Sequence, residues 1–172
     1  IQIYLSKPLS RVEYVVGKLG TLVFFLLLVT LAPALALLFL EIMFSASVAF
    51  VGANLFLIPA ITLYALVEVL LSAFTMLALS SLTTSARYTA MLYAGVVLFT
   101  AALFSILFGI TNSSALAWLS FRANLDQIGD VIFRLPPRYD SSWFLSVVVV
   151  ALLIGLSVFV LERRVRGAEV VT

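Results

Sequence analysis

Long uninterrupted runs of apolar residues dominate the chain. The first run, Leu19 to Leu40, contains no charged residue over 22 positions. A helix rises about 1.5 Å per residue, so this run would extend about 33 Å as a helix. The hydrocarbon core of a bilayer is about 30 Å thick, which such a helix can cross. Pro33 lies inside the run and predicts a bend in the helix instead of its end.

Three further runs have comparable lengths. The pattern therefore predicts four membrane-spanning helices, over 19–42, 55–82, 88–110 and 143–161. A membrane β-barrel is the competing interpretation because β-branched residues are frequent, but barrel strands have about ten residues of alternating polarity. The runs in this chain are much longer and apolar on every face. We therefore expect an all-α polytopic membrane protein.

The composition agrees with a membrane protein and removes several classes of function. Of the 172 residues, 64% are hydrophobic and 10% are charged. A soluble domain has about 45–50% apolar and about 25% charged residues. The net charge of +2 gives no reason to expect nucleic acid as a partner. The chain has no cysteine and no histidine, which excludes disulfides, thiolate nucleophiles, imidazole bases and most zinc or copper sites.

The distribution of lysine and arginine predicts the orientation of the spans. Four spans place both ends of the chain on one side of the membrane. That side holds Lys7, Arg11, Lys18, Arg87, Arg163, Arg164 and Arg166. The other side holds Arg122, Arg134 and Arg138, with Asp126, Asp130 and Asp140. Because basic residues are enriched in cytoplasmic loops, we expect both ends, including a basic tail over 162–172, in the cytoplasm.

Residues 111–142 form the one sizeable segment on the predicted outer side. Aromatic and aliphatic residues such as Trp118 and Phe121 are mixed there with charged ones such as Arg122. The pattern is typical of one or two short helices that lie at the membrane interface before Pro136-Pro137 ends the run. We interpret the segment as a folded outer cap, and a role in substrate passage or exit gating is the alternative.

Glu68 is the one charged residue inside the second apolar run. A carboxylate at mid-membrane is costly unless it is paired, protonated or facing water, so it should face the interior of the helix bundle. Helical spacing places Tyr64, Ser72 and Thr75 on the same face. This polar stripe either joins two helices by hydrogen bonds, contributes to a substrate path or a conformational switch, or couples the movement of protons.

The start of the first helix is also marked in the sequence. Ser10-Arg11-Val12-Glu13 fits a capping box, in which Ser10 is the N-cap and Glu13 reaches back to its amide. Pro8 lies just upstream, so the chain turns there and a helix can then run without interruption into the first span. Residues 1–18 are therefore expected to form a cytoplasmic elbow, which either only turns the chain at the membrane surface or docks a partner.

The same stretch carries a family resemblance. Pro8-Leu9-Ser10-Arg11-Val12-Glu13, followed by Gly17-Lys18, resembles the P-x-S-R-x-E-x-x-x-G-K motif of ABC-2 type transporter permeases, in the branch named for multicopper-enzyme maturation. Ala78-Leu79-Ser80-Ser81-Leu82-Thr83 and the basic ending after Leu161 resemble further stretches of that family. The family pattern has six spans, of which two precede the motif. The chain would then be the C-terminal part of a six-helix, type V exporter-like fold, in agreement with its start at Ile1 without a methionine.

The resemblance implies how such a protein would work. It would be the membrane subunit of an exporter, paired with a second permease subunit in a homodimer and surrounded by lipid in a bacterial inner membrane. Cytosolic ABC ATPase subunits would bind ATP and Mg²⁺, since this sequence contains no G-x-x-x-x-G-K-[ST] motif, and the chain itself would be neither an enzyme nor a holder of cofactors. The coupling elbow would comprise Lys7, Pro8, Ser10, Arg11, Glu13 and Lys18.

Three other functions stay open from the residues alone. An intramembrane enzyme is disfavoured because serine and most zinc types need histidine, and all three aspartates fall within 111–142. An ion-coupled carrier or channel would rest on Glu68, without a second buried charge. A passive assembly scaffold is the third. A partner ATPase would separate the exporter from all of them, and no residue pattern indicates the substrate.

Overall fold

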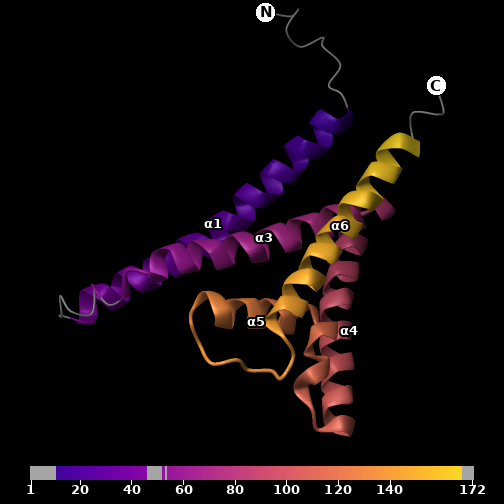
Figure 1. The fold of residues 1–172 in the computed structure, drawn as a ribbon. Coiled ribbons are helices and arrows are strands. Elements are labelled where there is room, and N and C mark those ends of the chain that lie inside the picture. Colours follow the sequence, from indigo (N-terminus) through magenta and orange to yellow (C-terminus); the bar gives the residue numbers. More distant parts are fainter. Residues whose placement is uncertain (1–10, 46–51, 53, 168–172) are drawn as a thin grey trace, which may run out of the picture.

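The computed structural model describes residues 11–45, 52 and 54–167, and these ranges are helical apart from turns and loops (Figure 1). In chain order the elements are α1 (Arg11–Ser45), α3 (Leu57–Leu82), α4 (Ala86–Thr111), the short 3-10 helix η2 (Ser114–Leu119), α5 (Phe121–Ile132) and α6 (Trp143–Gly167). By length and composition α1, α3, α4 and α6 could each cross a membrane. The prediction of an all-α chain with four long apolar helices is confirmed, and these helices suggest a multi-pass membrane protein.

Two helices extend beyond the predicted spans. α1 starts at Arg11, well before the span expected over 19–42, and it continues through Pro33 to Ser45. Ser10, the predicted N-cap, lies outside the described residues. α6 runs on to Gly167, so the first part of the predicted tail 162–172 is helical. Both extensions carry the helix past the apolar run into residues with charged side chains.

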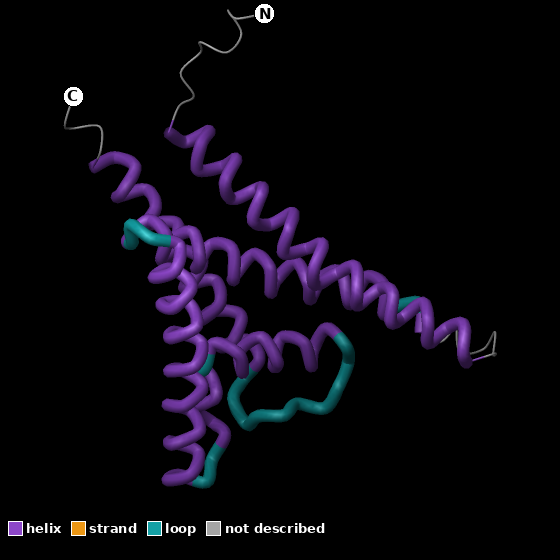
Figure 2. Tube along the Cα trace, turned by 180° about the vertical axis from the view of Figure 1, so that it is seen from behind, coloured by secondary structure: helices purple, strands orange, loops and turns teal. Residues whose placement is uncertain are grey.

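Among the long helices, α3 contacts each of the other three. α1 and α3 run alongside each other and lead away from α4 and α6, and α5 lies in the space between (Figures 1 and 2). The start of α1 and the end of α6 lie at one end of the molecule, together with the α3–α4 turn. The basic residues Lys18, Arg87, Arg163 and Arg164 belong to the helix ends that meet there. The first described residues of α1 and the last of α6 thus lie at the same end of the molecule.

Local hydrogen bonds fix the connections between helices. In the α3–α4 turn the hydroxyl oxygens of Thr83 and Thr89 are 2.6 Å apart and share a hydrogen bond. α4 ends at Asn112, which adopts the left-handed conformation (φ 51°) and donates its N–H to the carbonyl of Phe108. This is a common helix stop, and asparagine tolerates it better than most residues. The Ser120 side chain caps α5 by accepting the N–H of Ala123.

A first apolar cluster joins three helices at the shared end. Leu77 and Ala78 of α3 and Leu161 of α6 are buried there, and Val15, Leu19 and Leu22 of α1 pack against them. Lys18 lies on the same part of α1 and donates from Nζ to Ser80 Oγ over 3.4 Å. The beginning of α1 is therefore attached to both α3 and α6.

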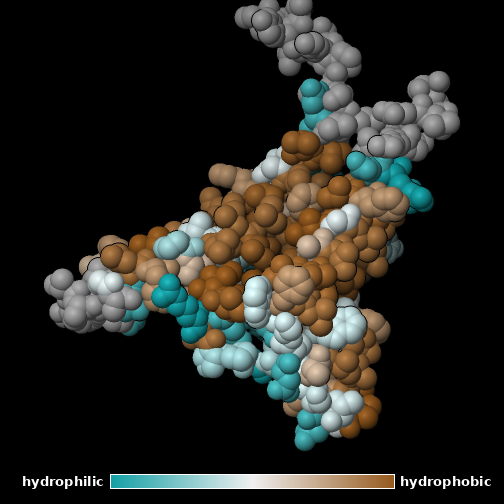
Figure 3. Space-filling model, viewed as in Figure 1, coloured by the Kyte–Doolittle hydropathy of each residue, from teal (hydrophilic) through white to brown (hydrophobic). Residues whose placement is uncertain are grey.

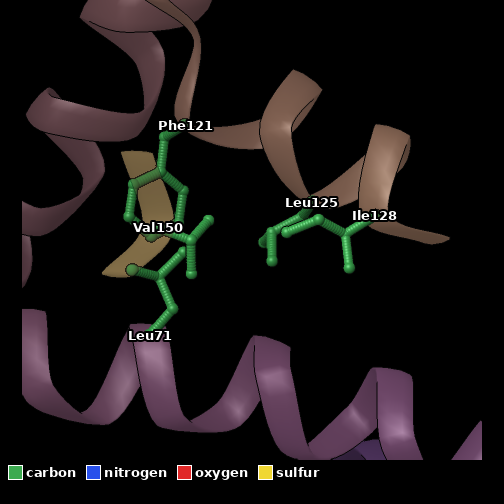
Figure 4. Close-up of a cluster of buried hydrophobic side chains, with 5 residues drawn as sticks. All are labelled: Leu71, Phe121, Leu125, Ile128 and Val150. Carbon is green, nitrogen blue, oxygen red and sulfur yellow. The ribbon is translucent and has the colours of Figure 1, made fainter. Parts of the chain in front are cut away.

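A second apolar cluster surrounds α5 (Figure 4). Leu125 and Ile128 point from α5 toward α3, and Phe121 lies beside Leu71 of α3 and Val150 of α6. All five side chains are buried. In a lipid environment such contacts stabilise helix association through close van der Waals packing. The hydrophobic effect contributes little there, because the hydrocarbon outside the bundle is as apolar as its interior.

Most of the remaining surface is apolar. Figure 3 shows hydrophobic residues across the greater part of one face, with hydrophilic residues near the helix ends and around the α5 region. α4 has no buried side chain at all, and exposed large side chains on it include Leu98, Phe99 and Ile106. An exposed apolar area of this extent is expected of a protein that faces lipid or other membrane helices.

We expect Leu71→Ala to lower the free energy of unfolding by about 2 kcal/mol or more, because the fully buried side chain leaves a cavity among α3, α5 and α6. Leu70→Ala is the matched control: its neighbouring side chain is 37% exposed, and its loss should cost far less. Reversible unfolding in mixed detergent micelles measures both. Equal losses of unfolding free energy in Leu71→Ala and Leu70→Ala would contradict the packing of Leu71 against α5.

Candidate binding cavity between α3, α4 and α5

α5 begins part-way along α4 instead of beyond its end. The N–H of Phe121 donates to Thr100 Oγ1 over 3.2 Å, and the Phe121 ring meets that of Tyr93 edge-on with centroids 6.1 Å apart. Thr100 lies about 16 Å along the helix axis from the end of α4, at about 1.5 Å per residue. η2 therefore leads the chain back along α4, and α5 then packs among α3, α4 and α6.

One face of α5 carries buried polar groups, and the protein provides partners for most of their atoms; Asn124 Oδ1 is buried and accepts no hydrogen bond from the described residues. The side-chain amide of Gln127 donates to the carbonyl of Ser141, and its Oε1 accepts from the hydroxyls of Ser141 (2.8 Å) and Ser146 (2.9 Å). Asn124 Nδ2 donates to the carbonyls of Trp118 (2.8 Å) and Ser120 (2.7 Å). Such bonds are required because a buried polar group without a partner is strongly destabilising.

Asp130 is also buried and is paired with the loop that follows α5. Its Oδ1 lies 3.0 Å from Arg138 Nε, and its Oδ2 accepts the backbone N–H of Arg138 over 3.1 Å. The backbone carbonyl of Asp130 accepts from the N–H of Leu135 over 2.7 Å. These contacts hold residues 133–142 against α5 and stabilise the charge of a carboxylate that has little access to solvent.

Gly129 allows α5 to approach α3 closely. A Cβ atom at this position would lie 2.9 Å from Cε2 of the Tyr64 ring, which is closer than van der Waals contact permits. The Tyr64 ring also packs against Phe133, with centroids 5.7 Å apart. Tyr64 is therefore held between the last turn of α5 and the residue that follows it.

A cavity of about 360 Å³ lies between α3, α4 and α5. One part of its wall is apolar and aromatic and comes from α4 and α5. The polar part comes from α3 and α5. The lining residues are Tyr64, Glu68 and Ser72 of α3, Tyr93, Ala94, Val97 and Leu98 of α4, and Phe121, Arg122, Leu125 and Asp126 of α5.

The cavity brings together charges that are far apart in the sequence. Glu68 and Asp126 are half-buried, and Arg122 is exposed at the rim. Among the described residues the only ion pair within 4.0 Å joins Asp130 and Arg138, so neither carboxylate of the cavity is paired in that way with Arg122. No group of three or more acidic residues in the described ranges is placed to hold a metal ion.

The predicted polar stripe of α3 is divided in the structure. Tyr64, Glu68 and Ser72 line the cavity, and Ser72 Oγ accepts a hydrogen bond from the Tyr93 hydroxyl over 2.9 Å. Thr75 lies outside this lining, and its hydroxyl donates to the carbonyl of Leu71 one turn earlier. Three of the four residues therefore share one wall, and the fourth is satisfied within its own helix.

Part of the predicted coupling elbow lies outside the described residues, namely Lys7, Pro8 and Ser10. Arg11 starts α1, and its side chain is not among those described. Glu13 and Lys18 lie on the first turns of α1 and line one groove with Tyr14 and Gly17. The described part of the elbow is thus the beginning of a long helix.

Tyr139 lies in the loop that follows α5, where burial and nearby charges change the pKa of its phenol. Its ring meets Phe104 edge-on at 5.7 Å. Burial raises the pKa of the Tyr139 phenol above its ordinary value, and the negative charge of Asp126 raises it further. The phenol is therefore neutral at physiological pH.

Comparison with known proteins identifies no relative of this chain: no family model, curated protein or solved structure matches it.

Sequence reasoning missed Arg122 and Asp126 as neighbours of Glu68. Both were expected in an outer cap at the membrane interface, whereas α5 packs between the long helices. The signal for this was present: Asn124, Gln127 and Asp130 recur at three-residue spacing, and Phe121, Leu125 and Ile128 form a separate stripe. A helix with both a polar and an apolar stripe to bury is typical of an element packed on several sides. The sequence indicated no second buried charge to accompany Glu68, whereas in the structure the half-buried Asp126 lines the same cavity.

We expect Gln127→Ala to lower the free energy of unfolding by about 2–3 kcal/mol, since three hydrogen bonds at about 1 kcal/mol each are lost and the buried Ser146 hydroxyl loses its acceptor. Detergent unfolding curves measure the loss. Ser142→Ala is the control, because its side chain is exposed and should change stability by less than about 0.5 kcal/mol. A Gln127→Ala variant as stable as the control would show that this network does not hold α5.

We expect Gly129→Ala to displace the Tyr64 ring and to cost about 1–3 kcal/mol of stability, since the added methyl has no room. Gly155→Ala in α6 is the matched control, because nothing lies within 4 Å of the added Cβ there. Combining Gly129→Ala with Tyr64→Ala should remove most of the extra cost, which a double-mutant cycle measures. Additive losses in that cycle would contradict the close contact.

Proposed function

We propose that this chain is the transmembrane permease subunit of an ABC transporter, which exports a substrate through the cavity between α3, α4 and α5. The energy would come from separate cytosolic ATPase subunits that bind ATP and Mg²⁺. The observation that carries the proposal is the continuity from the motif-bearing start of α1 to α3, the helix that provides Glu68 to the cavity. The chain would be no enzyme by itself.

The packing of α1 supports a mechanical role for its first turns. α1 is helical without a break from Arg11, and its residues Val15, Leu19 and Leu22 contact the end of α3. Glu68 lies about 14 Å along α3 from Leu77, at about 1.5 Å per residue. Because packed helices move as stiff bodies, a push on the start of α1 by an ATPase would shift α3 and with it one wall of the cavity.

The surface of the cavity supports entry from the side. Ala94 and Leu98 of α4 line it and are exposed on the surface, where lipid would surround a spanning helix. α4 has no buried side chain, and the side of it that does not pack on α3, η2 and α5 is left for contact with lipid and with a second copy of the permease. The family resemblance implies a bacterial inner membrane, and the distribution of lysine and arginine supports an orientation with both ends in the cytoplasm.

An ion-coupled carrier is the second candidate, and a specific observation favours it. Glu68 shares its cavity with Asp126 and Arg122, so the protein has more than one charge with which to bind or exchange an ion. A membrane assembly scaffold would need no such cavity. The exporter would use ATP hydrolysis and the carrier an ion gradient, so an experiment that identifies the source of energy distinguishes the two.

Purification of the protein from its native membrane in mild detergent tests the exporter. We expect a cytosolic ATPase with a G-x-x-x-x-G-K-[ST] motif to co-elute, to be identified by mass spectrometry and to hydrolyse ATP. The Arg11→Glu, Glu13→Lys double variant should retain at most about one-tenth of the co-eluting ATPase, on the order of the loss of binding expected when close charges at an interface are reversed. Glu41→Lys, at the opposite end of α1, is the matched control and should retain the ATPase.

Both variants must unfold at the same temperature as the native protein for the comparison to count. Absence of any ATPase under gentle conditions would refute the exporter. Uptake into vesicles that follows an imposed ion gradient and is abolished by Glu68→Gln would then establish the carrier.

A further inference from the structure

The cavity is lined by two acidic side chains and one basic side chain. Glu68 and Asp126 contribute two carboxylates to its wall, and Arg122 contributes one guanidinium. Asp130 and Arg138 do not line the cavity, and they neutralise each other in an ion pair at 3.0 Å. Arg122 can balance only one of the two carboxylates. The electrostatic field of the cavity therefore favours a cation, and its partly apolar surroundings weaken the screening of that field.

Another part of the cavity wall is apolar and aromatic. Tyr93 and Phe121 are arranged edge to face at 6.1 Å, and Val97 and Leu98 extend this surface along α4. The hydrogen bond from the Tyr93 hydroxyl to Ser72 fixes the orientation of its ring. Faces of aromatic rings attract cations and also pack well against hydrocarbon. This wall suits an apolar body, which a hydrated inorganic ion does not have.

We propose that the cavity binds an organic cation with an apolar body, whose ammonium group lies between Glu68 and Asp126 and whose body lies against Tyr93 and Phe121. The volume of about 360 Å³ is within the range of small-molecule sites, which begins at about 300 Å³. Access beside the exposed Leu98 of α4 suits a ligand that partitions into the membrane before it binds. If the chain is a transporter, this cation would be its cargo. Only the role of the cation as cargo rests on the proposed function, and its binding to the cavity does not.

Binding to the purified chain in detergent tests this directly. The probe is (3-phenylpropyl)trimethylammonium, and isothermal titration calorimetry measures its affinity. Two further probes share the phenylpropyl body: the neutral carbon isostere, in which carbon replaces nitrogen, and the anion 4-phenylbutyrate. We expect saturable binding of the cation and at least tenfold weaker binding of both other probes, because only the cation gains from the excess carboxylate.

Variants locate the site. Glu68→Gln and Asp126→Asn should each weaken binding of the cation at least tenfold, and Arg122→Gln should tighten it, since a competing positive charge is removed. Glu41→Gln is the matched control: it removes an exposed carboxylate near the far end of α1 and should leave the affinity unchanged. Thermal unfolding of each variant in the same detergent verifies that its fold is intact.

Three results would each overturn the proposal. The first is an affinity for the neutral isostere equal to that for the cation, and the second is an unchanged affinity for the cation in both Glu68→Gln and Asp126→Asn. The third is displacement of the cationic probe by sodium at the same concentration as the probe. The last result would assign the cavity to an inorganic cation. Cation binding in a protein that has no ATPase partner would leave this inference standing and refute the exporter. ATP-driven transport by a chain that binds no organic cation would refute this inference and leave the exporter standing.

Discussion

The hydrogen bonds and the ion pair made by buried polar groups of α5 determine where this helix lies among the long helices. α5 brings Asn124, Gln127 and Asp130 among helices that are otherwise apolar, where water and lipid offer few hydrogen bonds. Their partners are backbone carbonyls around η2, serine hydroxyls at the start of α6 and the guanidinium of Arg138. The position of the loop 133–142 and of the first turn of α6 follows from these bonds. Their loss would release α5 from the bundle.

With two of its faces fixed in this way, α5 presents its third face to the cavity. The apolar face packs on Leu71 and Val150, and the polar face is bonded to the loop and to α6. Arg122 and Asp126 lie on the part that is left, opposite Glu68 of α3. Gly129 sets the distance between the two helices, since any side chain there would meet the Tyr64 ring. The charged lining is thus a consequence of how α5 is anchored.

The two apolar clusters give α3 a central place. Its C-terminal part is held by α1 and α6 through Leu77 and Ala78, and its middle is held by α5 and α6 through Leu71. Glu68 lies one turn before Leu71 on the same helix. The start of α1 and the cavity are therefore both connected to α3, through two separate apolar clusters. Such a connection is what a transporter driven by an external ATPase requires, and it equally suits a carrier in which ligand binding moves the helices.

The sequence by itself determined the helical class, the number of long apolar helices and the common side of the chain ends, because the length and charge of each apolar run depend only on local order along the chain. It also indicated Glu68, whose charge is conspicuous in an apolar run. The position of α5 was decided only by the tertiary structure. Its residues fit an interfacial helix equally well in isolation, since an amphipathic pattern does not reveal whether lipid, water or protein covers each face. Only the partners of Gln127 and Asp130, which lie 8 to 19 positions further along the chain, distinguish the two arrangements. The cavity, with charges contributed by two helices, exists only once those partners are in contact.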